Sequence, residues 1–211
     1  MTHLDKLISI AGGPLSHDQP TLSARTMSLG GMRAKELLEL LSKRNGFYAF
    51  EGALHVFPVS VLGPAIGIEQ WNDAGLWRGD YPEISEEALF FAEDIFGGQF
   101  CIEEDRVFSF DPETGQLEHL ADDLDGWAKA ILMDYEVLTG HPLAKSWQVE
   151  NGRLPEGRRL VPITPFVMGG EFSIGNLRAC DAVQGMRLRA EIAAKIRDLP
   201  DGASVAFGVS D

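Results

Sequence analysis

The feature of this sequence that most constrains its fold is a series of short apolar segments, separated by turn residues, between positions 89 and 121. Residues 89–92 are continuously apolar, and the segments 100–102 and 107–110 carry large apolar side chains at alternate positions. Short apolar segments of this kind, bounded by turn signals, are typical of β-strands. The stretch therefore predicts an antiparallel β-meander, with a short helix from Ser85 as the alternative for residues 89–92.

The alternation of side chains also predicts how the meander packs. Phe100 and Ile102 share one face of their strand, and Phe108 and Phe110 share one face of the next strand. We expect these two faces to pair and to bury four large side chains, each contributing about 1.5–3 kcal/mol. Residues 111–115, Asp-Pro-Glu-Thr-Gly, then predict a turn, because the proline presets φ and the glycine accepts a positive φ.

A helix is predicted after the meander, from about Asp123 to Thr139. Its large apolar side chains recur at spacings of three or four residues and mark one buried stripe: Leu124, Trp127, Ile131, Tyr135 and Leu138. Acidic residues at 122, 123 and 125 favour the N-terminus of this helix through capping and the helix dipole. Gly140 is expected to end it.

The rest of the chain predicts further helices and strands around this unit. The expected elements are helices at 32–44, 143–150 and 183–199, strands at 47–50, 54–57, 176–182 and 204–209, and loops at 154–175 with an extended piece at 166–168. Residues 61–82 are expected to form an irregular crossing, or one helical turn at 68–71. We predict a single α+β domain over 32–211, with helices packed on a mostly antiparallel sheet. Residues 1–31 are expected to form an arm or loop, with at most one short turn of helix near residues 4–10.

The negative charge of the chain is concentrated in its middle part. The formal net charge is −14 at pH 7, and residues 83–136 alone contain 16 acidic and 2 basic side chains, so the remainder is neutral overall. Such a field repels nucleic acid and steers basic partners toward the protein in a salt-dependent way. The alternative is a solvated face that only keeps the protein soluble.

No recognised catalytic or metal-binding motif occurs in the sequence. There is no phosphate-binding glycine loop, no nucleophile elbow and no metal-ligand spacing of histidines and cysteines. His55 and His119 fall in predicted strands, where a histidine is more often a hydrogen-bonded core or edge residue than a ligand or a base. We therefore expect no metal and no cofactor, and an enzyme only if its active site is assembled from scattered residues.

The compartment is predicted from the cysteines and from hydropathy. Cys101 and Cys180 are expected to be free, packed thiols, with a disulfide or a functional thiol as alternatives. The sequence has no run of 18 apolar residues and no secretory signal pattern. We expect a cytoplasmic protein that does not enter a membrane.

The middle of the chain resembles the SUKH superfamily. The matching features are residues 89–94 ahead of Gly97-Gly98-Gln99-Phe100, the acidic turn before 107–110, the 111–115 turn, and Ala121 followed by Trp127. The tryptophans ahead of Tyr81-Pro82 also suit the family, so the resemblance covers residues 71–140. It implies an α+β fold and a non-enzymatic binding role. Bacterial members are typically cytoplasmic immunity proteins that bind and neutralise toxin domains, often nucleases.

The leading hypothesis is therefore a protein that neutralises a basic toxin domain. The runner-up is a regulatory or scaffold module with an endogenous partner, and the third is an uncharacterised enzyme. The candidate partner-binding residues are acidic side chains of the meander and its helix, with two tryptophans: Glu103, Glu104, Asp105, Asp111, Glu113, Glu118, Asp122, Asp125, Trp71 and Trp77. Each tryptophan is more simply explained as packing at the margin of the core.

Overall fold

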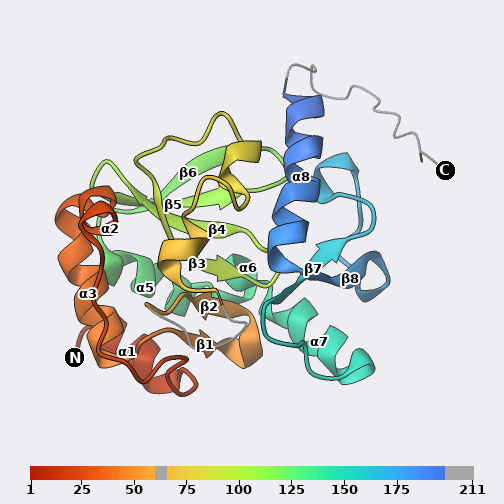
Figure 1. The fold of residues 1–211 in the computed structure, drawn as a ribbon. Coiled ribbons are helices and arrows are strands. Elements are labelled where there is room, and N and C mark those ends of the chain that lie inside the picture. The colour runs from red at the N-terminus through yellow and green to blue at the C-terminus, as the bar shows by residue number, and fades with distance from the viewer. Residues whose placement is uncertain (60–65, 198–211) are drawn as a thin grey trace.

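A six-stranded antiparallel sheet forms the centre of the computed structural model, which describes residues 1–59 and 66–197 (Figure 1). Its strands are β1 (Phe47–Ala49), β2 (Leu54–Val56), β3 (Leu89–Asp94), β4 (Gln99–Glu103), β5 (Arg106–Asp111) and β6 (Gln116–Ala121). Strands that follow one another in the sequence are neighbours in the sheet. The predicted meander is confirmed, and the two predicted strands at 47–50 and 54–57 extend it.

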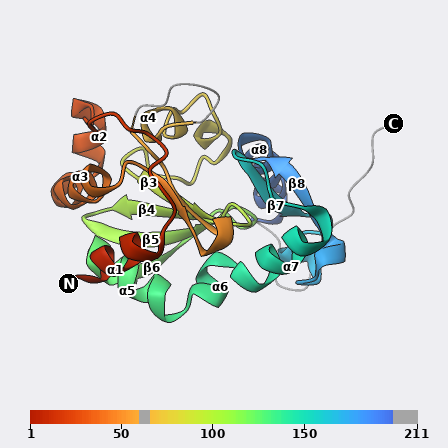
Figure 2. The ribbon, with the colours of Figure 1, turned by 90° about the horizontal axis from the view of Figure 1, so that it is seen from below.

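Helices and a second, two-stranded antiparallel sheet surround this centre. The helices are α1 (His3–Ile10), α2 (Ala24–Leu29), α3 (Ala34–Lys43), α4 (Ile68–Trp71), α5 (Leu124–Met133), α6 (Tyr135–Thr139), α7 (His141–Asn151) and α8 (Ala182–Ile196); the second sheet pairs β7 (Arg158–Pro162) with β8 (Leu177–Asp181). The N-terminal helices lie on one side of the molecule, and α8 lies with β7 and β8 on the other (Figures 1 and 2). The predicted α+β fold is confirmed.

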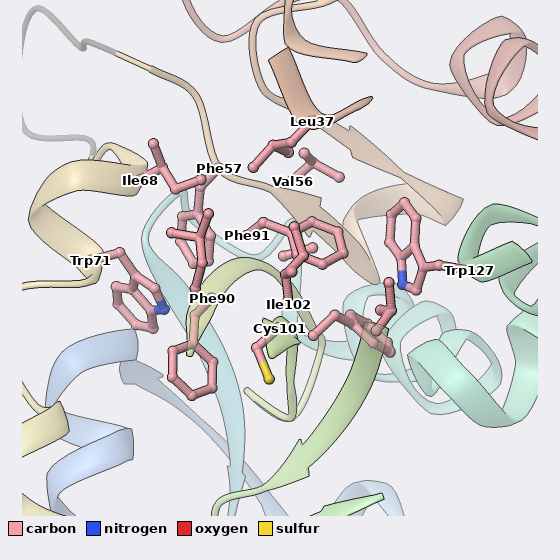
Figure 3. Packing of buried hydrophobic residues seen from close by; sticks show 14 of the residues in the cluster. Leu37, Val56, Phe57, Ile68, Trp71, Phe90, Phe91, Cys101, Ile102 and Trp127 are labelled. Atoms are coloured by element: carbon pink, nitrogen blue, oxygen red, sulfur yellow. The ribbon is translucent and has the colours of Figure 1, made fainter. Parts of the chain in front are cut away.

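The central sheet is buried on both faces, as the two phenylalanines in the middle of β3 show. Phe90 meets the ring of Trp77 edge-on at a centroid distance of 5.0 Å, whereas Phe91 meets Trp127 of α5 at 5.0 Å. Trp71 and Trp127 accordingly lie on opposite sides of the buried cluster (Figure 3). Two covered faces explain why 89–92 is continuously apolar.

The register of β4 and β5 contradicts the predicted pairing of their aromatic faces. The two strands are joined by a two-residue turn, Glu104 and Asp105, with φ of 47° and 59°, and Glu103 pairs with Arg106. With this turn length Phe100 lies opposite Ser109, so Phe100 and Phe110 point to opposite faces of the sheet. Both are still buried, at 3% and 1% exposed, because each face has its own aromatic core, while Phe108 is only half-buried.

The first 31 residues contain more helix than the predicted arm. α1 is an eight-residue helix with a capping box at Thr2, and the short helix α2 begins after the N-cap Ser23. Leu7 is fully buried, and α1 packs on α5, where the Asp125 carboxylate accepts a hydrogen bond from the Leu4 amide at 3.0 Å. This segment is part of the hydrophobic core.

Three other predicted elements differ from the structure. The 123–139 helix is broken at Asp134 into α5 and α6, which lets Tyr135 stack on Phe50 at a centroid distance of 4.9 Å. The predicted loop 154–175 contains strand β7, and its expected extended piece is the 3-10 helix η4 (Phe166–Met168). The helices at 32–44, 143–150 and 183–199, the turn at 68–71 and the 176–182 strand are confirmed within a few residues. The 204–209 strand lies outside the described residues.

Candidate functional site

The acidic candidate residues are divided between two ends of the central sheet. Glu103, Glu104 and Asp105 lie at the β4–β5 turn, and Asp122 and Asp125 follow β6 at the same end, because Ala121 pairs with Val107. Asp111 and Glu113 lie in the turn at the opposite end, and Glu118 lies within β6. β6 is the last strand in the sheet order. The sequence therefore predicted that this region is acidic. In the structure, the acidic candidates are distributed between two ends of the central sheet and strand β6.

Several of these carboxylates hold the fold together. Asp105 accepts a hydrogen bond from the Met32 amide at 2.7 Å, and Asp125 binds the start of α1. Asp111 accepts bonds from the Glu113 amide and the Thr114 hydroxyl within its own turn. Acidic residues at these turns and helix starts therefore stabilise the fold, because their carboxylates accept hydrogen bonds from nearby backbone amides.

Of the remaining acidic candidates, Glu103 is half-buried and Glu113 is buried. The other three, which we call the acidic edge, are Glu104, Glu118 and Asp122. The side chains of Glu104 and Asp122 are 76% and 87% exposed, and their ion-pair partners, Arg106 at 3.8 Å and His119 at 3.2 Å, are themselves about half exposed. Glu118 is also exposed on β6. Such surface pairs contribute little to stability, so these carboxylates are available to a partner.

The two tryptophan candidates are core residues. Trp71 and Trp77 are each 1% exposed. Trp71 stacks on Phe57 at a centroid distance of 4.7 Å and donates its indole N–H to Gln99 Oε1 at 2.8 Å. Neither ring can contact a partner in this fold, which corrects their assignment as binding residues and agrees with the packing interpretation.

A buried ionic group, the Glu93 cluster, joins the central sheet to the second sheet. It consists of Glu93 on β3, His55 on β2 and Arg159 on β7, all at most 7% exposed. Glu93 Oε1 lies 2.7 Å from Arg159 Nη2 and 2.9 Å from His55 Nδ1. Burial raises the pKa of Glu93, but the Arg159 charge and the His55 hydrogen bond outweigh it and hold that pKa at about 2. Burial also lowers the pKa of His55. Arg159 Nε and Nη2 have no hydrogen-bond partner among the described residues, so its contact with Glu93 is an ion pair without a hydrogen bond. We interpret the cluster as structural, because its charges are buried and paired with one another.

A cavity of about 380 Å³, which we call the Asp94 pocket, opens at the end of the sheet where β3 and β5 finish. Its lining includes Asp94, Glu113 and Arg189. One wall is aromatic: Phe166 of η4 is stacked on Phe172 at a centroid distance of 3.9 Å, and Phe96 meets Phe166 edge-on at 5.4 Å. Phe172 is 68% exposed at this wall. The pocket thus combines carboxyl groups with exposed aromatic surface.

Few interactions in this pocket offset the cost of burying its carboxyl groups. Asp94 Oδ1 accepts hydrogen bonds from the Phe96 and Gly98 amides, at 2.7 and 2.8 Å, yet burial raises the pKa of Asp94 to about 7. Burial also raises the pKa of Glu113, which is 4% exposed. Glu113 Oε2 accepts a bond from the Val167 amide at 2.9 Å, while its Oε1 has no partner among the described residues. A buried acceptor of this kind favours a ligand that donates a hydrogen bond.

Arg189 does not neutralise these carboxyl groups directly. It is 3% exposed, and its donors are directed to the carbonyl oxygens of Gly185 and Phe96 and to the sulfur of Met186. Sequence reasoning selected Glu113 but missed Asp94 and Arg189. Asp94 is hidden at the end of an apolar strand, and Arg189 lies on the inner side of an otherwise ordinary helix.

Within residues 1–59 and 66–197, no group of three or more His, Cys, Asp or Glu side chains is arranged to hold a metal ion. Cys101 and Cys180 are free and buried, as predicted. None of the helices in these two ranges combines the length and the apolar character needed to cross a membrane.

Comparison with known proteins supports the fold alone. No protein-family model matches the sequence, and no curated protein matches it. The chain is similar to the crystal structure of Atu4351 from Agrobacterium tumefaciens, with a TM-score of 0.62 and 14% sequence identity over 87% of this chain and 86% of that one. The same arrangement of elements therefore occurs in a distant sequence.

Proposed function

We propose that this chain is a non-enzymatic, cytoplasmic protein-binding module of the SUKH-like immunity kind, which neutralises a basic toxin domain of the nuclease type. The acidic edge is the observation that carries the proposal. Its carboxylates are exposed and are not needed by the core, whereas Asp105, Asp111 and Asp125 bind backbone amides of turns and of α1. The resemblance of residues 71–140 to SUKH proteins adds the class of partner.

Electrostatics explains how such an edge would select its partner. A nuclease domain carries basic side chains where it binds phosphates. Opposite charge accelerates encounter and penalises partners of the wrong sign, in a salt-dependent way. A protein bound over the phosphate-binding groove excludes nucleic acid from it. Neutralisation then requires no chemical step.

Charge reversal at the acidic edge tests the proposal. Gene context is used first to find a toxin domain encoded beside the gene for this chain. Binding of that purified domain is then measured by isothermal titration calorimetry at two salt concentrations. Glu104→Lys with Asp122→Lys is expected to weaken binding at least about tenfold, since close charge pairs at interfaces contribute 1.5 kcal/mol or more. The matched control is Glu150→Lys with Glu156→Lys, two exposed residues away from this edge. Equal losses in both double variants would contradict the proposal.

Gene context separates this function from the runner-up. A regulatory or scaffold module would use the same kind of surface, but its gene would stand apart from toxin genes and its partner would be an endogenous protein. An isolated gene, together with no binding to any toxin domain of the same genome, would favour the scaffold function.

Enzymatic activity is a second candidate that one observation favours. The pKa of Asp94 at about 7 suits a general acid or base at neutral pH, and this residue lines a cavity. Turnover of a small compound that is lost in Asp94→Asn would establish such an activity and replace the binding proposal.

A further inference from the structure

The Asp94 pocket contains an acceptor that the fold leaves unused. Glu113 is only 4% exposed, and its Oε1 receives no hydrogen bond from the described residues. Leaving a buried acceptor unpaired is unfavourable, because its interactions with water are lost and not replaced. The other oxygen of the same carboxyl group is used by the Val167 amide. Oε1 is closed to solvent in this conformation, so a donor from outside the chain would satisfy it once the Glu113 carboxyl group rotates toward the cavity.

The charge of the pocket indicates that this donor is a cation. The lining contains three carboxyl groups, those of Asp94, Asp111 and Glu113, against the single guanidinium of Arg189. That guanidinium already donates to the carbonyl oxygens of Gly185 and Phe96, so an anion would find its donors occupied. Asp94 uses only Oδ1 for its two backbone bonds, and Oδ2 can accept another.

The walls of the pocket select among cations. Phe166 and Phe172 are stacked, and Phe172 is exposed, so the site offers a flat aromatic surface beside its carboxyl groups. A planar guanidinium can donate two parallel hydrogen bonds and stack on an aromatic ring, whereas an ammonium acts as a point charge. Exposed Val137 and Val167, which also line the cavity, suit the aliphatic part of a side chain.

We propose that the Asp94 pocket binds one arginine side chain of the basic protein partner, with the guanidinium donating to Glu113 Oε1 and stacking on Phe172, and with its aliphatic stem against Val137 and Val167. The inference depends on the proposed function only for the source of the arginine. It assigns a specific anchor to a partner that the acidic edge attracts by charge. The acidic edge and the pocket are thus two separate sites on one molecule.

The experiment uses the full chain and a small probe, so it does not depend on the toxin partner. Nα-acetyl-argininamide is titrated into the ¹⁵N-labelled protein and followed by NMR. Perturbed amides are expected at residues 94–98, 113–114 and 166–172. Nα-acetyl-lysinamide is expected to bind more weakly. Glu113→Gln, which keeps an acceptor for the Val167 amide, should weaken arginine binding about tenfold, the effect of losing a hydrogen bond to a charged group.

Two further variants keep the test decisive. Phe172→Ala removes an exposed ring and should weaken binding about threefold without unfolding the protein. Glu150→Gln, at an exposed position of α7 that does not line the pocket, is the matched control and should leave probe binding unchanged. The inference is overturned if the probe perturbs only the acidic edge, or if Glu113→Gln and Phe172→Ala bind it as the unmodified protein does. A negative probe titration alongside a positive charge-reversal result would reject the pocket and retain the proposed function.

Discussion

Glu93 and Asp94 are consecutive residues at the end of β3, and burial acts on both carboxyl groups, yet their pKa values are shifted in opposite directions. The pKa of Glu93 is about 2 and that of Asp94 is about 7. Glu93 lies 2.7 Å from the guanidinium of Arg159. The guanidinium nearest to the Asp94 pocket, that of Arg189, is held by backbone carbonyl oxygens instead.

The difference separates a structural carboxylate from an available one. Burial disfavours the charged form of either residue, and only a close, correctly placed cation reverses that effect. The fold supplies this cation to Glu93 from β7, and the ion pair thereby fastens the second sheet to the first. No described residue forms an ion pair with Asp94, and the charges of Arg189 and Arg159 lower its pKa by less than burial raises it. The same argument identifies the pocket as a place where a ligand can supply the missing charge.

The largest effect that tests this comparison is expected from Arg159→Met. The variant leaves Glu93 buried without its counter-charge, which typically costs about 3–5 kcal/mol of stability. The free energy of unfolding is measured by urea denaturation at pH 7. Arg158→Met is the control, because Arg158 is the exposed neighbour of Arg159 on β7. Equal stabilities of the two variants would show that the cluster is not a structural ion pair.

A variant that removes both charges sharpens this result. Glu93→Leu combined with Arg159→Met is expected to recover most of the stability lost in Arg159→Met, because replacing a buried ion pair by apolar side chains is often neutral. A double variant as unstable as the single one would indicate that packing, and not the unpaired charge, causes the loss.

Asp94→Asn is expected to have a smaller, pH-dependent effect. Asp94 has a pKa of about 7 in the folded state, above the unfolded value of 3.8, so the folded protein binds the extra proton between these values. The contribution of this group to stability is therefore greatest at low pH and is lost as pH rises toward 7. Asn keeps the Oδ1 acceptor and has no charge to bury, so Asp94→Asn should be more stable than the unmodified protein at pH 8, by about 1–3 kcal/mol.

Glu93 gives the opposite dependence in a lower range of pH. Its folded pKa of about 2 lies below the unfolded value of 4.5, so its contribution is present above pH 4.5 and is lost as pH falls toward 2. Urea denaturation of the unmodified protein and of Asp94→Asn from pH 2 to pH 8 separates the two effects. Parallel curves for the two proteins would contradict an uncompensated carboxyl group at Asp94.

Local signals in the sequence were sufficient for most of the fold. Apolar segments, turn residues and helix periodicity predicted the meander, α3, α5, α7 and α8. The prediction that the aromatic faces of β4 and β5 pair was wrong, because the register of the two strands depends on the length of the turn between them. Glu104-Asp105 adopts a two-residue turn with positive φ, although its residues are not the Asn-Gly or Asp-Gly pair that identifies such turns.

The sites were less predictable because they join distant residues. Arg159 reaches Glu93 across 66 positions of the sequence, and Glu113 meets the Val167 amide across 54. Composition showed that residues 83–136 are acidic, but it could not separate carboxylates that close turns from those that are exposed. Asp105 and Glu104 are adjacent, and only the first is bound to another element, through the Met32 amide. Tertiary contacts alone make that distinction.

The smallest effect on stability is expected at the acidic edge. Glu118→Gln with Asp122→Asn removes two exposed charges, and Asp122 is 87% exposed beside a half-exposed His119. The free energy of unfolding should change by less than about 0.5 kcal/mol, because exposed ion pairs contribute little. A loss above about 1 kcal/mol would place these residues with the structural acids. If stability is unchanged while binding to the basic partner falls, the fall reports lost contacts at the surface and not a damaged fold, which distinguishes this third class of carboxylate from Glu93 and Asp94.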